Sequence, residues 1–253
     1  LEAALIEHKP AILAIVHAET STGVCQPMDG VGDLCRKYDC LLLLDTVTSL
    51  GGVPLYIDEW KVDLAYSCSQ KGLSCPPGLG PFTMGPRAEA KMEARTGKVP
   101  NWYLDVSLLN KYWGSDRVYH HTAPVNMNFG MREALRLLAE EGVNQSWARH
   151  RQNAEALWSG LESLGLSMHV PADRRLPTLT TVRIPEGVDG KAFSQHLLNQ
   201  HGIEIGGGLG SLAGKIWRIG LMGYNSNPEN VNHLLNLFES ELPKFGGSVA
   251  SAA

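Results

Sequence analysis

The stretch Leu41-Leu-Leu-Leu-Asp45 places an acid directly after four leucines. An apolar run with no polar alternation is typical of a parallel strand that is covered on both faces. Open α/β sheets bind ligands beyond the carboxyl ends of their strands, which is where Asp45 lies in this interpretation. Asp is also favoured in turns and at helix starts, so a purely structural role is the alternative.

Around this strand, the first half of the chain alternates apolar runs with helical segments, which predicts an α/β fold with a mostly parallel sheet. We expect residues 101–122, which are rich in aromatic side chains, to form an irregular loop. The other elements expected in this half are strands at 11–16, 62–66 and 80–84 and helices at 30–38 and 88–95.

The second half predicts a smaller α+β domain. A long helical pattern runs from Asn126 to Leu164, with a break at Gly142 that we take as the boundary between domains 1–141 and 142–253. The segment 178–184 alternates and predicts a half-exposed strand. Further elements are a strand at 215–220 and helices at 190–199 and 228–242, and from Phe245 onward we expect flexible chain.

Composition excludes some classes of partner. The chain has 253 residues and a formal net charge of -4, with no long basic run, so we expect neither nucleic acid nor an anionic membrane as a partner. No apolar run approaches the roughly 20 residues that cross a bilayer.

The five cysteines fit reduced thiols, and neither Cys35-x4-Cys40 nor Cys68-x6-Cys75 has the short spacing of a structural zinc site, so we expect no metal.

Lys71, in Ser69-Gln-Lys-Gly72, is the candidate catalytic residue. A lysine that forms a Schiff base with pyridoxal phosphate needs an acid elsewhere to keep the pyridine nitrogen protonated, and Asp45 ends the preceding long strand. A solvated surface lysine is the alternative. Arg218 follows Trp217 in a short strand, where it could bind a carboxylate through two parallel hydrogen bonds or simply be exposed.

Five blocks occur in an order and spacing that resemble the alanine–glyoxylate (serine–pyruvate) aminotransferases, which are class V, fold-type I pyridoxal-phosphate enzymes. The resemblance covers residues 1 to about 243. The blocks are Thr20-Ser-Thr-Gly23, Asp45-Thr-Val-Thr-Ser-Leu-Gly-Gly52, Ser69-Gln-Lys-Gly72, Tyr119-His-His-Thr122 and Trp217-Arg-Ile-Gly220.

The resemblance implies a role for each matching residue. Lys71 matches the Schiff-base lysine, Asp45 the acid on the pyridinium nitrogen, and Arg218 the arginine that binds the substrate carboxylate. It also implies a homodimer whose subunits share cofactor sites, acting on an amino acid and a 2-oxo acid. The remaining cofactor-binding matches are Val47 against the ring, Thr20 near its phenolic oxygen, Gln70 on the phosphate, and Tyr119 and Thr122 on the phosphate of the neighbouring subunit.

The implied reaction moves an amino group from alanine or serine to glyoxylate, giving glycine and pyruvate or hydroxypyruvate. Leu1 is not Met, and the family's large domain begins before the matching point, so we expect that an N-terminal part is missing. A fragment without catalysis, or another class V enzyme, is the alternative. Family members occur in peroxisomes or mitochondria, and the Ser251-Ala-Ala253 end is not the Ser-Lys-Leu type of peroxisomal signal.

Overall fold

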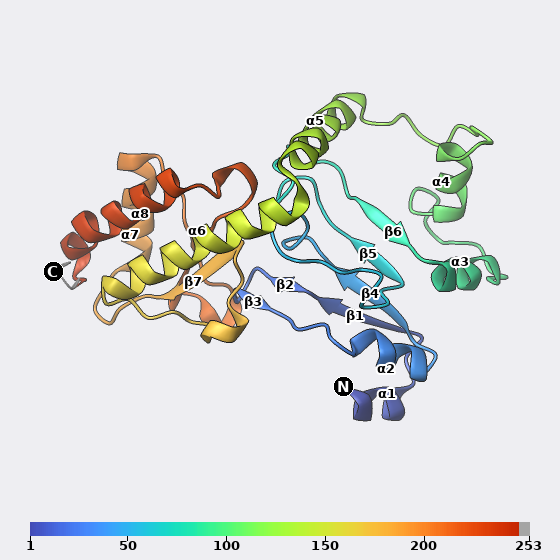
Figure 1. The fold of residues 1–253 in the computed structure, drawn as a ribbon, viewed down its shortest axis with the longest axis horizontal. Coiled ribbons are helices and arrows are strands. Elements are labelled where there is room, and N and C mark those ends of the chain that lie inside the picture. Colours follow the sequence, from blue (N-terminus) through green and yellow to red (C-terminus); the bar gives the residue numbers. More distant parts are fainter. Residues whose placement is uncertain (248–253) are drawn as a thin grey trace.

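The computed structural model describes residues 1–247, and it is elongated, with a long central helix, α6 (Val143–Ser163), that leads from the first half of the chain into the second (Figure 1). The break between α5 and α6 at Gly142 is confirmed, because α5 (Val125–Glu141) ends there. The elements before α5 are α1 (Glu2–His8), β1 (Ile12–Val16), β2 (Ala18–Glu19), β3 (Val24–Cys25), α2 (Val31–Lys37), β4 (Leu41–Asp45), β5 (Leu64–Tyr66), β6 (Phe82–Met84), α3 (Pro86–Glu93) and α4 (Val106–Trp113).

Four of these strands form the predicted, mostly parallel sheet, in the order β1-β4-β5-β6. The β1–β4 and β4–β5 pairs are parallel, and β6 pairs antiparallel to β5. Helices α1 and α2 cover one face, where Leu5 and Cys35 pack against Leu42 and Leu44 in a buried cluster. Because Leu42 and Leu44 alternate with Leu43 and Asp45, the carboxylate of Asp45 lies on the opposite face.

That opposite face carries solvent-exposed apolar side chains. The strand register places Val16, Asp45, Tyr66 and Phe82 in one row across the sheet. Val16, Tyr66 and Phe82 are 38%, 39% and 47% exposed, and Ile12 is 48% exposed. We call this surface the open face of the sheet.

The aromatic segment 101–122 differs from the irregular loop that we expected, because α4 lies within it. The Asp105 side chain caps this helix by accepting the Ser107 backbone N–H at 3.0 Å, a start signal that the aromatic composition hid. In Figure 1, α3 and α4 form an arm at the end of the molecule that lies farthest from β7. The arm exposes large side chains: Trp102, Tyr103, Leu104, Trp113, Val118 and Tyr119.

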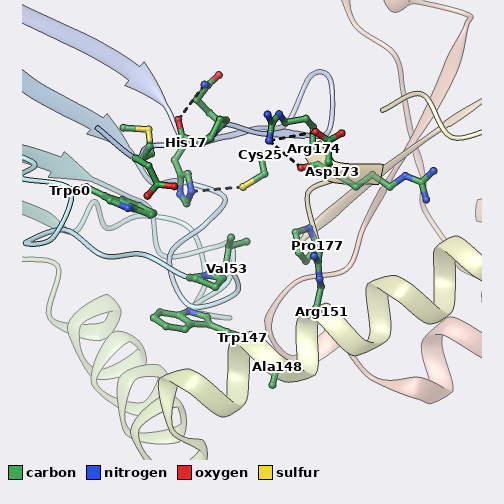
Figure 2. A pocket seen from close by; sticks show the side chains of 16 residues that line it. His17, Cys25, Val53, Trp60, Trp147, Ala148, Arg151, Asp173, Arg174 and Pro177 are labelled. Carbon is green, nitrogen blue, oxygen red and sulfur yellow. Dashed lines mark hydrogen bonds and ion pairs between the residues drawn. The ribbon is translucent and has the colours of Figure 1, made fainter. Parts of the chain in front are cut away.

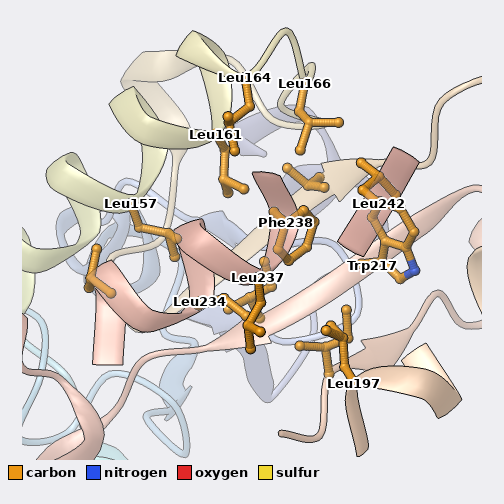
Figure 3. Close-up of a cluster of buried hydrophobic side chains, with 14 of the residues drawn as sticks. Leu157, Leu161, Leu164, Leu166, Leu197, Trp217, Leu234, Leu237, Phe238 and Leu242 are labelled. Atoms are coloured by element: carbon orange, nitrogen blue, oxygen red, sulfur yellow. The ribbon is translucent and has the colours of Figure 1, made fainter. Parts of the chain in front are cut away.

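The second half has its own hydrophobic core, which Figure 3 shows around Phe238. The Phe238 ring lies 5.1 Å from Phe193 and 5.6 Å from Trp217, both in edge-on contacts. The helices and strands of this half are β7 (Leu179–Arg183), α7 (Gly190–His201), β8 (Gly206–Gly207), β9 (Ile216–Gly220) and α8 (Pro228–Glu241), with 3-10 turns at Ala172–Arg174, Gly210–Leu212, Gly223–Asn225 and Leu242–Phe245.

Strand β7 is buried along four of its five residues, so the prediction of a half-exposed strand was wrong. On one side, Trp158 of α6 donates a hydrogen bond to Thr180 at 2.8 Å. On the other side, Thr181 donates to the Thr22 carbonyl at 2.8 Å, so the loop after β2 covers the face that the alternation had assigned to solvent. Sheet β7-β9-β8 is therefore packed on both sides.

At the chain end, Phe245 belongs to the last 3-10 turn and packs against the core, in contrast to the flexible chain expected from that residue. Residues 248–253 lie outside the described part. Among residues 1–247, no helix combines the length and apolar character that a membrane crossing requires.

Phe238→Ala should lower the free energy of unfolding by about 3–5 kcal/mol, because it leaves a cavity among fully buried rings. The midpoint of urea unfolding measures the effect. Phe129→Ala is the matched control, since Phe129 on α5 is 65% exposed and its truncation leaves no cavity. Equal midpoints for the two variants would contradict this account of the core.

Candidate active site

The candidate site begins at Asp45, the last residue of β4. One carboxylate oxygen accepts the backbone N–H of Val47 at 2.8 Å, which turns the chain sharply at the end of the strand. The other oxygen accepts the phenolic O–H of Tyr66 at 2.6 Å. A carboxylate has about four lone-pair positions, so Asp45 can accept a further hydrogen bond from a ligand on the open face.

Tyr66 is a site residue that the sequence reading missed. Its hydrogen bond to Asp45 raises the pKa of the Tyr66 phenol to about 12, because ionisation would place a phenolate against the carboxylate. The strand ends indicate this contact. Where two parallel strands are in register, the last residue of β5, Tyr66, lies beside the last residue of β4, Asp45.

Lys71 lies in a turn after β5 that packs backbone to backbone on the loop 46–52. A Cβ at Gly72 would meet the Leu50 carbonyl oxygen at 2.3 Å, so only glycine allows this approach. Ser74 closes the turn by donating its N–H to the Lys71 carbonyl at 3.0 Å. The glycine after Lys71 thus fixes where the lysine leaves the backbone.

Lys71 lines a cleft of about 540 Å³ between this turn and the end of β9. Gln70 and Ser74 line it from the first half of the chain, and Gly220 and Asn225 from the second. Within residues 1–247, the Lys71 amine has no hydrogen-bond or ion-pair partner. A free amine in a cleft of small-molecule size is available to a ligand.

Arg218 points from β9 to the same side of its sheet as Gly220, since residues two apart share a face. Its Nε donates to the Gly207 carbonyl at 2.7 Å, and its Nη1 to the Thr20 carbonyl at 3.2 Å. These bonds leave the remaining Nη hydrogens for a carboxylate. Thr20 and Arg218, both predicted site residues, are therefore in contact although they are 198 positions apart.

The first turns of α6 hold both walls of the cleft. Ser146 donates to the Gly51 carbonyl at 2.7 Å, next to the loop that contacts Gly72. His150 accepts the Gly223 N–H at 2.8 Å, and Arg149 donates to the carbonyls of Gly223 and Ser226 at 2.9 and 2.6 Å. Burial lowers the pKa of His150, which keeps the imidazole neutral as this acceptor role requires.

Tyr119 and Thr122 do not line the Lys71 cleft. Their hydroxyl groups lie 3.0 Å apart in the segment between α4 and α5, and Tyr119 is 71% exposed. His120, between them, is buried and stacks on Trp102 with ring centroids 4.0 Å apart. His120 therefore has a structural role, while the hydroxyl groups of Tyr119 and Thr122 face outward.

A second cavity, of about 490 Å³, holds none of the predicted site residues (Figure 2). His17 and Cys25 meet there, with 3.7 Å between Nε2 and Sγ. Burial lowers the pKa of His17 to about 4 and raises the pKa of the Cys25 thiol. Nucleophilic cysteines have a lowered pKa, and burial shifts the pKa of Cys25 the other way. All five cysteines are free thiols, as expected.

Lys71 and Gln70 line the cleft, whereas Asp45, Val47, Thr20 and Arg218 are not among its lining residues. Taken together, these groups fit the chemistry of pyridoxal phosphate. The cofactor requires an amine, an acid for its ring nitrogen and a donor for its phosphate, and the described residues offer Lys71, Asp45 and Gln70. Two observations support this fit. Within residues 1–247 the Lys71 amine has no partner, and Asp45 has spare acceptor positions. Metal coordination is not needed for any of these contacts.

Comparison with known proteins also indicates an aminotransferase. The family model described as Aminotransferase class-V matches residues 2–234. Alanine–glyoxylate aminotransferase of Oryctolagus cuniculus is 46% identical over 247 residues, which are 96% of this chain and 63% of the relative.

Two solved structures are similar over nearly the whole chain. The alanine–glyoxylate aminotransferase from Nostoc sp. has a TM-score of 0.93 and 63% identity, covering 94% of this chain and 63% of that one. The ureidoglycine–glyoxylate aminotransferase from Bacillus subtilis has a TM-score of 0.96 and 39% identity, covering 99% and 65%. The chain thus spans less than two thirds of the length of these proteins, and it shares the fold-type I architecture.

The hydrogen bond between Tyr66 and Asp45 can be tested by titration. In cofactor-free protein, Tyr66 should ionise near pH 12, and Asp45→Asn should move its pKa down toward the ordinary 10.0 because the carboxylate charge is gone. The difference in phenolate absorbance between each protein and its Tyr66→Phe counterpart isolates this group. Ionisation near pH 10 in both backgrounds would refute the contact.

Gly72→Ala should destabilise the protein by about 1–3 kcal/mol, because its Cβ drives the Lys71 turn away from Leu50. Thermal unfolding measures the loss. Gly80→Ala is the matched control, since a Cβ there comes no closer than 3.7 Å to the nearest atom, the Ser67 carbonyl oxygen. Equal effects of the two substitutions would show that the close approach at Gly72 does not constrain the turn.

Proposed function

Because the chain belongs to the class-V aminotransferase family, whose members use pyridoxal phosphate, we propose that it carries an aminotransferase site with Lys71 as the catalytic residue. The proposed reaction transfers the amino group of alanine or serine to glyoxylate, giving glycine and pyruvate or hydroxypyruvate. The observation that supports it best is the unpartnered Lys71 amine in the cleft between the two halves of the chain.

The names of the relatives favour glyoxylate as the acceptor. Both the alanine–glyoxylate and the ureidoglycine–glyoxylate enzymes carry it in their names, whereas their donors differ. We therefore propose glyoxylate first, alanine or serine as the donor, and (S)-ureidoglycine as the alternative donor. Initial rates with glyoxylate and each donor in turn decide between them.

In the proposed site, Lys71 attaches the cofactor through Nζ, and Asp45 keeps the ring nitrogen protonated. When bound, pyridoxal phosphate supplies the electron sink that stabilises the negative charge left when the substrate loses its Cα proton. The Lys71 amine would be the base that accepts this proton. Val47, Thr20 and Gln70 would contact the ring face, the phenolic oxygen and the phosphate, respectively.

Arg218 orients the substrate in this proposal. A carboxylate binds best to a guanidinium through two parallel hydrogen bonds. Since Nε and one Nη1 hydrogen are already bonded to backbone carbonyls, the carboxylate would bind at the Nη1–Nη2 end. This fixes one end of both the amino acid and the 2-oxo acid relative to Lys71.

We also propose that the active form is a homodimer. The Tyr119 and Thr122 hydroxyls are assigned to the phosphate, and neither lines the Lys71 cleft of its own chain. The exposed aromatic side chains of the α3–α4 arm support an interface there, because clustered exposed aromatics are typical of contact surfaces. Light scattering on the purified protein tests the assembly.

A chain without catalysis of its own is the second candidate. The exposed apolar side chains of the open face favour it, because Asp45 lies among them and pyridoxal phosphate there would lack a covering wall. An absorbance band of bound cofactor that shifts with alanine and returns with glyoxylate supports the enzyme. A colourless purified protein supports this second candidate.

Lys71→Ala should lower the transamination rate by at least about a thousandfold, as removal of an activated nucleophile does elsewhere. Borohydride reduction followed by peptide mass spectrometry should place the cofactor on Lys71 in the wild type only. Lys191→Ala, at an exposed position of α7, is the control and should leave the rate unchanged. Transamination that survives Lys71→Ala contradicts the assignment.

Arg218→Lys should lower kcat/KM for amino acid and 2-oxo acid by roughly 10–100-fold, mainly through KM, because an ammonium group cannot form the paired hydrogen bonds. Steady-state kinetics measure the change. Arg183→Lys is the control, because Arg183 ends β7 in an exposed position of the same sheet. Similar kinetics for Arg218→Lys and the wild type would remove Arg218 from the substrate site.

A further inference from the structure

The C-terminal ends of α7 and α8 bring three metal-binding side chains together, far along the chain from Lys71. His201 is the last residue of α7, His196 lies five positions before it, and Glu241 is the last residue of α8. One ligand atom from each side chain lies within 4.8 Å of the other two. We propose that His196, His201 and Glu241 form a binding site for Zn²⁺ or a similar divalent transition-metal ion.

The separations between the ligand atoms suit such an ion. The Glu241 carboxylate oxygen Oε2 lies 2.6 Å from His196 Nε2 and 3.8 Å from His201 Nε2. Zinc binds imidazole nitrogen and carboxylate oxygen at about 2.0–2.2 Å, which sets tetrahedral ligands about 3.4 Å apart. The observed distances bracket this value, so small rotations of the side chains complete the site.

Solvent reaches the two imidazoles of the cluster more than it reaches the carboxylate. The side chain of Glu241 is 11% exposed, and those of His196 and His201 are 26% and 27% exposed. A buried carboxylate with two half-buried imidazoles gives three protein ligands and leaves a fourth position for water. Figure 1 places α7 and α8 next to each other at the end of the molecule where the chain ends.

The charges at this place favour a cation. The Glu241 carboxylate already lies against positively charged or hydrogen-donating groups, because His196 and Lys244 both hydrogen-bond to it. In the structure, the Lys244 ammonium group occupies this place, at 2.7 and 2.8 Å from the two Glu241 oxygens.

Lys244 therefore acts as the competitor of the metal. Its side chain is 60% exposed, so it can swing into solvent when the ion binds. The Lys244 ammonium group regains its hydration in water, and the bound ion replaces its positive charge beside Glu241. The site shares no residue with the Lys71 cleft, and its binding of metal is independent of the proposed aminotransferase reaction.

The experiment titrates Zn²⁺ into metal-free protein against a chromogenic chelator, and follows Co²⁺ absorbance as a report of tetrahedral coordination. The wild type should bind one equivalent of Zn²⁺. His201→Ala should bind it at least about tenfold more weakly, since even residues that only hydrogen-bond to metal ligands contribute about 10–100-fold to metal affinity. The His201 side chain makes no hydrogen bond within residues 1–247, so this variant should fold normally. Lys244→Ala should bind more tightly than the wild type.

His233→Ala is the matched control, because His233 is exposed on α8 outside the cluster. The zinc affinity of this variant should equal that of the wild type. Zinc should also raise the thermal midpoint of the wild type but not that of His201→Ala, because binding to the folded state alone stabilises it. Equal zinc affinity in wild type and His201→Ala would overturn the proposal. Weaker binding by Lys244→Ala would overturn it as well.

Discussion

The cleft depends on the polar side chains in the first turns of α6. Ser146 binds the loop that follows Asp45, while Arg149 and His150 bind the turn that follows β9. One rigid helix thereby holds in place the Lys71 turn and the turn after β9, which both line the cleft. A neutral, buried His150 is essential to this arrangement, because a charged imidazole could not accept the Gly223 N–H. Everything proposed for Lys71 and Arg218 acting together requires these few hydrogen bonds.

The sequence could propose those candidate-site residues that a local pattern indicates. Asp45 ends a strand of leucines and Lys71 lies among small polar residues, and both patterns have a direct physical meaning. The contact of Thr20 with Arg218 could not be predicted, because it joins residues 198 positions apart through a backbone carbonyl. Tyr66 was missed since its role appears only when the strand register is known.

The fold was predictable where burial follows the residue pattern, as in the parallel sheet and the helix break at Gly142. It was not predictable for β7, whose threonines alternate like a half-exposed strand but hydrogen-bond to Trp158 and to the loop after β2. Hydroxyl groups allow such burial because each one finds a partner. The His196–Glu241 cluster was likewise invisible, since no short spacing links its residues.

The two carbonyls that hold Arg218 have a consequence for conformational entropy. A free arginine side chain has about 2 kcal/mol of rotamer entropy, and a ligand that immobilises it must offset that loss. Here the Gly207 and Thr20 carbonyls restrict the guanidinium before any ligand arrives. The entropy cost of ordering the Arg218 side chain is therefore part of the free energy of folding. Carboxylate affinity then depends on the stability of the loops around Thr20 and Gly207. A mutation that loosens either loop would weaken carboxylate binding without touching the arginine.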